Sequence, residues 1–191
     1  MKEKILFVNS CVRGENESRT LALAKIALSR LDGDIEEIRL ADADLKPLDA
    51  AGLAKRAESA EKNDFSDPVY DCAKQFAACD TVVIAAPFWD YSFPAFLKIY
   101  IESLCVGGLT FLYGSDGVPI SYCRAKTLIY ITTSGGYIGG TDFGFEYIKT
   151  VTKSFFGIEN FSFFSAEGLD ILGNDPAAIL KAAQEKIERE L

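Results

Sequence analysis

Short, continuously apolar segments recur along the chain, and each is followed by a polar or glycine-rich loop and then by a helical pattern. The clearest is residues 81–86 (Thr-Val-Val-Ile-Ala-Ala), which Pro87 ends, and residues 5–8 and 126–133 have the same character. Strands that are apolar on both faces are typical of a parallel sheet covered by helices on both sides. Parallel strands need right-handed crossover connections. The alternation therefore predicts a doubly wound α/β fold.

The remaining segments fit this alternation. We expect two further strands, an edge strand of mixed character at residues 35–40 and a last strand at residues 160–165. We expect helices at residues 18–31, 66–79, 94–104, 142–156 and 175–191, a solvated helix or excursion at residues 50–62, and a glycine-punctuated excursion at residues 107–124. Five strands alternating with helices favour a five-stranded parallel sheet. Because no linker, repeat or low-complexity tract interrupts the pattern, we expect residues 1–191 to form a single domain.

Composition excludes several classes of function. The net charge is −8, with no basic cluster, so nucleic acid and anionic membranes are not expected partners. The first residues lack the apolar core of a signal peptide, no apolar run is long enough to span a membrane, and we expect a cytoplasmic protein. Five cysteines without a C-x-x-C pair favour free thiols in a reducing compartment. The absence of histidine excludes Ser-His-Asp and Cys-His hydrolases and every zinc site that uses histidine, and we expect no metal site.

The loop after the first strand carries the groups that bind anions. Between residues 9 and 20 it gathers the hydroxyls of Ser10, Ser18 and Thr20 and the guanidinium groups of Arg13 and Arg19, just before a helix begins. Hydroxyls, guanidinium groups and the free amides of a helix N-terminus all donate to an anion. We therefore expect a phosphate site here. The alternative is that Ser18 is only a helix cap and the arginines are solvated.

Cys11 lies in the same loop. A helix N-terminus and nearby arginines would lower the pKa of its thiol and make it reactive. The favoured alternative is a small loop residue without chemistry.

Two further loops follow the strands at residues 81–86 and 126–133. One is an aromatic wall at residues 88–91 (Phe-Trp-Asp-Tyr), and the other is a backbone cradle at residues 133–136 (Thr-Ser-Gly-Gly). Because ligands of open α/β sheets bind at the carboxyl ends of the strands, we expect the three loops to be neighbours. An anion site, a flat apolar wall and bare N–H groups together match flavin mononucleotide (FMN). Taken one by one, the aromatics could be core or interface residues and the glycines only a turn.

With these segments in order, the chain resembles the FMN-dependent NADH azoreductases and the related NAD(P)H:quinone oxidoreductases of flavodoxin-like fold. The resemblance spans nearly the whole chain. It is carried by Ser10, residues 18–20, 87–91, 94–98, 108–113, 133–136, 155–158 and 166–168.

The resemblance implies a flavodoxin-like sheet with strand order 2-1-3-4-5 and a homodimer with FMN at the interface. The nicotinamide cofactor, NADH or NADPH, and the acceptor would use one pocket in turn. The residues that would hold FMN are Ser10, Ser18, Arg19, Thr20, Pro87, Phe88, Trp89, Asp90, Tyr91, Thr133, Ser134, Gly135 and Gly136. Tyr113 and Phe155 correspond to aromatics around the family's substrate pocket, partly from the other subunit. No side chain is expected to be catalytic, because the flavin does the chemistry.

The chain departs from the family at two positions. The family's commonest aromatic loop is Met-Tyr-Asn-Phe, so Asp90 brings a negative charge where the family has a neutral amide. That charge would lower the flavin potential or weaken binding. The second cradle residue, often arginine in the family, is Ser134 here, so a positive charge is missing.

The expected function is an FMN-dependent NAD(P)H oxidoreductase that reduces quinones by two-electron, ping-pong transfer. Azo compounds are a further class of acceptor that the two departures leave open. The alternative is a flavodoxin-like electron carrier or flavin-binding module without its own NAD(P)H reaction. The long Ser-Cys-Val-Arg loop disfavours that alternative, because flavodoxins carry a Thr/Ser-rich loop with glycine there.

Overall fold

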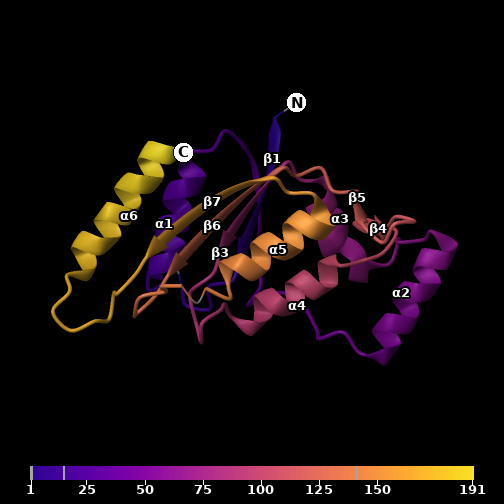
Figure 1. The fold of residues 1–191 in the computed structure, drawn as a ribbon, viewed down its shortest axis with the longest axis horizontal. Helices are drawn as coiled ribbons and strands as arrows, with labels where there is room; N and C mark the ends of the chain where they lie inside the picture. Colours follow the sequence, from indigo (N-terminus) through magenta and orange to yellow (C-terminus); the bar gives the residue numbers. More distant parts are fainter. Residues whose placement is uncertain (1, 15, 141) are drawn as a thin grey trace.

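The computed structural model describes residues 2–14, 16–140 and 142–191, so Glu15 of the predicted anion-binding loop lies outside the described residues. A parallel sheet of five strands runs through the middle of the molecule in the order β2-β1-β3-β6-β7 (Figure 1). The strands are β1 (Glu3–Asn9), β2 (Gly33–Arg39), β3 (Thr81–Ala85), β6 (Thr127–Thr133) and β7 (Asn160–Ala166). Counted among themselves, these strands have the order 2-1-3-4-5, which confirms the predicted flavodoxin-like fold.

Helices cover both faces of the sheet. They are α1 (Arg19–Ser29), α2 (Ala50–Lys62), α3 (Asp71–Ala78), α4 (Ala95–Leu104), α5 (Phe145–Phe156) and α6 (Pro176–Glu190), with a short 3₁₀ helix, η1 (Pro68–Tyr70). Successive side chains of a strand point to opposite faces. Leu6 and Val8 of β1 therefore pack in the cluster that includes α3, α4 and α5, whereas Ile5 and Phe7 pack in the cluster that includes α1 and α6. This two-sided burial explains the continuously apolar strands.

A side-chain cap sets the start of α1 close to where the sequence predicted it. The Ser18 hydroxyl accepts a hydrogen bond from the amide of Leu21 at 3.2 Å, and α1 begins at the next residue. Helix α5 starts at Phe145, three residues later than expected. The reason is that the Asp142 carboxylate accepts the amides of Gly144 and Phe145, both at 2.8 Å, and so Asp142 precedes the helix.

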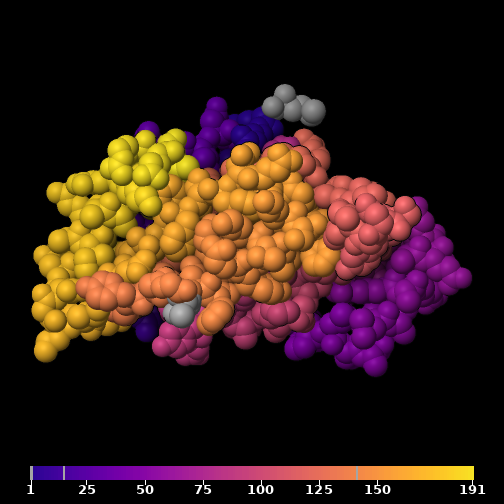
Figure 2. Space-filling view, viewed as in Figure 1, coloured from indigo at the N-terminus to yellow at the C-terminus, as the bar shows by residue number. Residues whose placement is uncertain are grey.

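The glycine-punctuated excursion contains structure that the sequence did not predict. Residues of β4 (Phe111–Tyr113) and β5 (Pro119–Ser121) pair antiparallel as a separate two-stranded sheet. This hairpin and α2 lie at the end of the molecule opposite α6 (Figures 1 and 2). No residue of α2 is buried, in agreement with the predicted solvated helix. Within the described part of the chain, every helix is too short or too polar to cross a membrane.

Candidate functional site

A cleft of about 270 Å³ opens at the carboxyl ends of the strands, where the loops after β1, β3 and β6 meet. It is lined by Cys11, Val12, Arg13, Glu17, Ser18, Arg19, Thr20, Pro87, Phe88, Trp89, Thr133, Gly135 and Asp170. Parallel strands that are neighbours in the sheet end at one edge, which is why segments more than a hundred residues apart come together here. The structure therefore confirms the predicted convergence of the three loops.

The first loop holds the hydroxyls and cations at the start of α1. Ser18, Arg19 and Thr20 occupy the N-cap and the first two helical positions, where helix amides lack intrahelical acceptors. Ser10 belongs to the same loop and precedes the lining residue Cys11 in the chain. Its side chain is buried, and its hydroxyl has no hydrogen-bond partner within the described residues. A buried hydroxyl without a partner is uncommon, so a ligand atom is a natural acceptor for it.

The surroundings of Cys11 do not favour a reactive thiol. It is 2% exposed, and burial raises the pKa of its thiol above the ordinary value. The hydrogen bond with Ser18 and the charge of Arg39 act in the opposite direction but are smaller. The structure therefore favours a loop residue without chemistry.

The second loop is a tight hairpin that presents aromatic side chains. The backbones of Trp89 and Ser92 exchange two hydrogen bonds of 3.0 and 2.7 Å across a two-residue turn. The turn residues Asp90 and Tyr91 have φ of 51° and 64°, a left-handed conformation that a two-residue hairpin favours but tyrosine rarely adopts. The Phe88 amide donates to the Thr133 carbonyl at 3.0 Å, which ties this loop to the third one.

The third loop is held by its carbonyl groups. The carbonyls of residues 134, 135 and 136 accept the amides of residues 169, 170 and 168, respectively, at 2.9–3.1 Å, and the Ser134 hydroxyl donates to the Gly136 carbonyl at 2.5 Å. The N–H groups of Gly135 and Gly136 take part in none of these bonds. A side chain at Gly136 would meet no atom within 4 Å, so its backbone is open to a ligand.

One buried contact joins the first and third loops. The hydroxyl oxygens of Thr20 and Thr133 lie 2.6 Å apart. This contact links the start of α1 to the end of β6.

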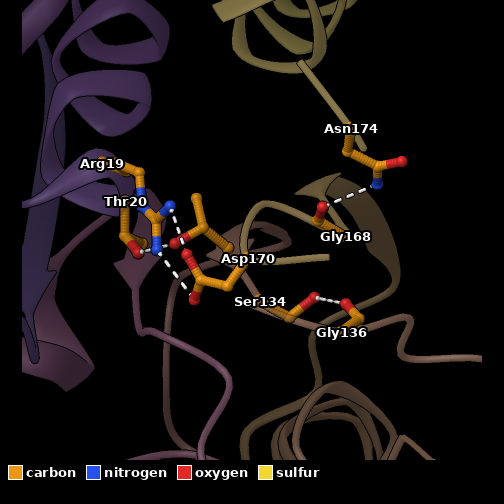
Figure 3. Close-up of polar contacts among 8 residues, drawn as sticks. Arg19, Thr20, Ser134, Gly136, Gly168, Asp170 and Asn174 are labelled. Carbon is orange, nitrogen blue, oxygen red and sulfur yellow. Dashed lines mark hydrogen bonds and ion pairs between the residues drawn. The ribbon is translucent and has the colours of Figure 1, made fainter. Parts of the chain in front are cut away.

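An ion pair that the sequence analysis did not consider closes one side of the cleft. Arg19 donates from both Nη atoms to the carboxylate of Asp170, at 3.0 and 3.3 Å (Figure 3). The hydrogen bonds from Arg19 hold the pKa of Asp170 below its usual value. Asp170 lies in the segment between β7 and α6, and no short sequence pattern relates it to Arg19.

The structure brings some of the predicted site residues together and leaves others outside. Eight of the expected FMN-binding residues line the cleft, namely Ser18, Arg19, Thr20, Pro87, Phe88, Trp89, Thr133 and Gly135. Ser10, Ser134 and Gly136 belong to the same loops next to the lining, and Asp90 and Tyr91 form the exposed tip of the hairpin.

Tyr113 and Phe155 do not line this cleft. Their rings are 6.3 Å apart and pack with Phe111 at the hairpin formed by β4 and β5. Helix α5 runs antiparallel to the strands, so Phe155, near its last residue, lies toward the amino ends of the strands. Within one chain the two aromatics therefore lie away from the cleft.

Comparisons with known proteins agree with one another. A family model described as flavodoxin-like fold matches residues 3–191. The chain is 32% identical to FMN-dependent NADH:quinone oxidoreductase 2 of Clostridium acetobutylicum, over 98% of this chain and 97% of that protein. It is also similar to an azoreductase structure from Bacillus anthracis, with a TM-score of 0.83 and 22% identity, covering 98% of this chain and 97% of that one. A B. anthracis FMN-dependent NADH-azoreductase in complex with FMN has a TM-score of 0.79 and 22% identity, covering 99% and 97%.

Proposed function

The chain belongs to the flavodoxin-like fold family that residues 3–191 match, and from this premise we propose that it is an FMN-dependent NAD(P)H:quinone oxidoreductase. The name of the C. acetobutylicum relative supports this activity, because that relative is similar over almost the full length of both chains. The B. anthracis structures support the fold, and their azoreductase names motivate azo compounds as a second class of acceptor to test.

The observation that carries the proposal is the chemistry of the cleft. One side has the start of α1 with Arg19, Ser18 and Thr20, which suits a phosphate. Another side has Phe88 and Trp89, which suit a flat heteroaromatic ring. No other described cavity has both features next to glycine-rich backbone at the carboxyl ends of the strands.

The residues present fit FMN. The hydroxyl of Ser10 is buried without a partner within the described residues, and Gly136 leaves its backbone open on the side where a Cβ would stand. We propose that Ser10 and residues 18–20 hold the phosphate. Residues 87–91 and 133–136 would hold the ring system.

When bound, FMN supplies the redox chemistry, accepting a hydride from the nicotinamide cofactor and passing two electrons to a quinone. The protein binds and orients the cofactor and the substrates. Its N–H groups at Gly135 and Gly136 would stabilise negative charge at a ring edge, and the exposed faces of Trp89 and Tyr91 would stack with planar substrates. NADH is the donor named for the relative, and NADPH is the second donor to test.

We further propose a homodimer. Tyr113, which the family resemblance assigns to the substrate pocket, is 57% exposed at the hairpin of β4 and β5, away from its own chain's cleft. Apolar side chains nearby are also exposed, with Leu112 at 48%, Ile120 at 54% and Tyr122 at 48%. Exposed apolar patches of this kind favour a protein interface. A second copy that covers this hairpin would bring Tyr113 and Phe155 to the partner's cleft.

The proposal also covers the domain organisation and the cellular location of the protein. We propose that residues 1–191 act as a single domain, since the five α-helices other than α2 all pack on one central sheet. We also propose a cytoplasmic location without nucleic-acid or membrane partners. The five free cysteines suit a reducing compartment, and the net charge of −8 disfavours polyanionic partners.

The deciding experiment is spectroscopic. The purified protein, reconstituted with FMN, should absorb near the flavin bands, lose that absorbance when mixed anaerobically with NADH, and regain it on addition of a quinone. Rapid reduction in stopped flow supports the oxidoreductase. Flavin that binds but is not reduced by either nicotinamide would favour the electron-carrier alternative, and a protein that cannot take up FMN would refute both.

A further inference from the structure

The guanidinium group expected to bind the cofactor phosphate already has a carboxylate partner. Arg19 uses both Nη atoms on Asp170, in the two-point geometry that arginine also uses for phosphate (Figure 3). Both residues line the cleft. A carboxylate and a phosphate cannot both take the same two donors of one guanidinium group.

The carboxylate also lies against the glycine cradle. A Cβ built on Gly135 would stand 2.5 Å from Oδ2 of Asp170, so the carboxylate fills the space that the missing side chain leaves. This is backbone that a flat ring would approach. The carboxylate of Asp170 therefore contacts the guanidinium group of the expected phosphate site and also lies against the glycine cradle.

The backbone of Asp170 is fixed, whereas its side chain has a route to solvent. The amide of Asp170 donates to the Gly135 carbonyl at 2.9 Å, and Asn174 donates to the Gly168 carbonyl at 2.7 Å, which ties down the loop. The side chain of Asp170 is 64% exposed, but that of Arg19 is only 34% exposed. A rotation of the Asp170 side chain alone would release the guanidinium group without moving the loop.

The charges in the cleft balance. Arg13 and Arg19 provide two positive charges, and Glu17 and Asp170 provide two negative charges. An incoming phosphate dianion thus meets a cleft without net positive charge. Neutralising Asp170 would leave the cleft with a net charge of +1. The affinity of a ligand without a phosphate would change little.

We propose that Asp170 and the phosphate of FMN are alternative partners of Arg19, so that Asp170 determines how strongly this site prefers a phosphorylated flavin over riboflavin. The inference rests on the proposed binding of FMN and concerns this chain's own residues. Asp170 is a specificity-determining residue in this account. It takes no part in electron transfer.

The test compares affinities rather than turnover. Flavin fluorescence titrations would give the Kd of FMN and of riboflavin for the natural protein and for the Asp170→Asn and Asp170→Ala variants. We expect both variants to bind FMN about three- to tenfold more tightly, the range for one partly exposed charge, with riboflavin changed less than about twofold. Glu61→Gln, on the solvated helix α2, is the control for loss of one negative charge and should leave both affinities unchanged.

A double variant shows whether the effect passes through Arg19. In an Arg19→Gln background, which itself should weaken FMN binding, the gain from Asp170→Asn should disappear. Weaker FMN binding by Asp170→Asn would mean that Asp170 orients Arg19 for the phosphate and would overturn the proposal. Equal changes for FMN and riboflavin, or no change, would also overturn it.

Inorganic phosphate keeps this test separate from the proposed function. The melting temperature in phosphate, compared with chloride at equal ionic strength, should rise more for Asp170→Asn than for the natural protein. If the natural protein binds neither flavin, the proposed function fails, and the phosphate series still decides whether Asp170 competes for Arg19. An equal rise in both proteins would refute the competition.

Discussion

The hydroxyl groups of Thr20 and Thr133 lie 2.6 Å apart in the interior, joining the start of α1 to the end of β6. The two side chains are 2% and 7% exposed. Each comes from a different loop of the cleft, so this contact joins the phosphate side to the glycine cradle, alongside the Arg19–Asp170 ion pair. Its loss should lower both the free energy of unfolding and the affinity for the cofactor.

Replacement of Thr20 by valine tests this link. Thr20→Val keeps the shape but leaves the Thr133 hydroxyl without its partner, which should lower the free energy of unfolding by about 1–3 kcal/mol. We expect the Kd of FMN to rise severalfold in fluorescence titrations. Thr152→Val is the matched control, because the buried Thr152 hydroxyl donates to the Ile148 carbonyl at 2.7 Å within α5, outside the cleft lining. An equal rise of Kd in both variants would mean that the link has no special role.

A substitution in the glycine cradle should lower FMN affinity without lowering the stability of the fold. The φ of Gly136 lies outside the left-handed region and no atom lies within 4 Å of a built Cβ, so Gly136→Ala should leave the unfolding free energy unchanged or raise it by about 0.4–1 kcal/mol. The added methyl group would stand where a ring approaches, and FMN affinity should fall. Gly107→Ala, also without neighbours within 4 Å, is the control in thermal unfolding and in flavin titration. Unaltered FMN affinity in Gly136→Ala would place the ring elsewhere.

The charge of Asp90 should influence the redox potential. Asp90→Asn removes a negative charge at the hairpin tip, and asparagine tolerates the φ of 51° at this position. A negative charge near the ring destabilises the reduced flavin, so the midpoint potential should rise, by about 30 mV for each tenfold change in a two-electron equilibrium. Potentiometric titration of the FMN-loaded protein measures it. A potential that does not move would show that the carboxylate is directed away from the flavin.

Two buried thiols predict a loss of stability at alkaline pH. Burial raises the pKa of Cys123 to about 11 and that of Cys79 to about 12. Below the ordinary thiol pKa of about 8.5 both states are protonated and stability is complete. As the pH rises from there toward 11 and 12, thiols in the unfolded chain ionise first, so folding loses about 1.4 kcal/mol per pH unit for each thiol.

Urea unfolding at pH 7, 9 and 10 measures this slope, and Cys123→Ala should reduce it. If the variant and the natural protein have the same slope, another group is responsible. Thiol reagents at pH 8 should also label the native protein slowly at Cys79 and Cys123 and rapidly in urea.

Several features of the fold could be predicted from local sequence. The apolar runs of β1, β3 and β6 indicate burial on both faces, and that requires helices on both sides of a parallel sheet. The Ser18 and Asp175 caps place the starts of α1 and α6 within a residue, because capping depends on neighbours two or three positions away. The convergence of the three loops follows from right-handed crossovers.

Other features were missed for a physical reason. The strands β4 and β5 have three residues each, too few for a periodic pattern to be recognised. The left-handed φ of Tyr91 is imposed by the closure of the hairpin, since nothing in the residue type favours it.

From sequence alone came the order along the chain of the five strands of the main sheet and of the α-helices, the edge of the sheet at which a ligand binds, and most of the residue types gathered there. These depend on periodicity and on near neighbours, which the linear chain records. Only the tertiary structure decided that Arg19 pairs with Asp170, 151 positions away, and that Tyr113 and Phe155 lie apart from the cleft. Such pairings depend on the directions of side chains after helices and strands have packed, and packing is a property of the whole core.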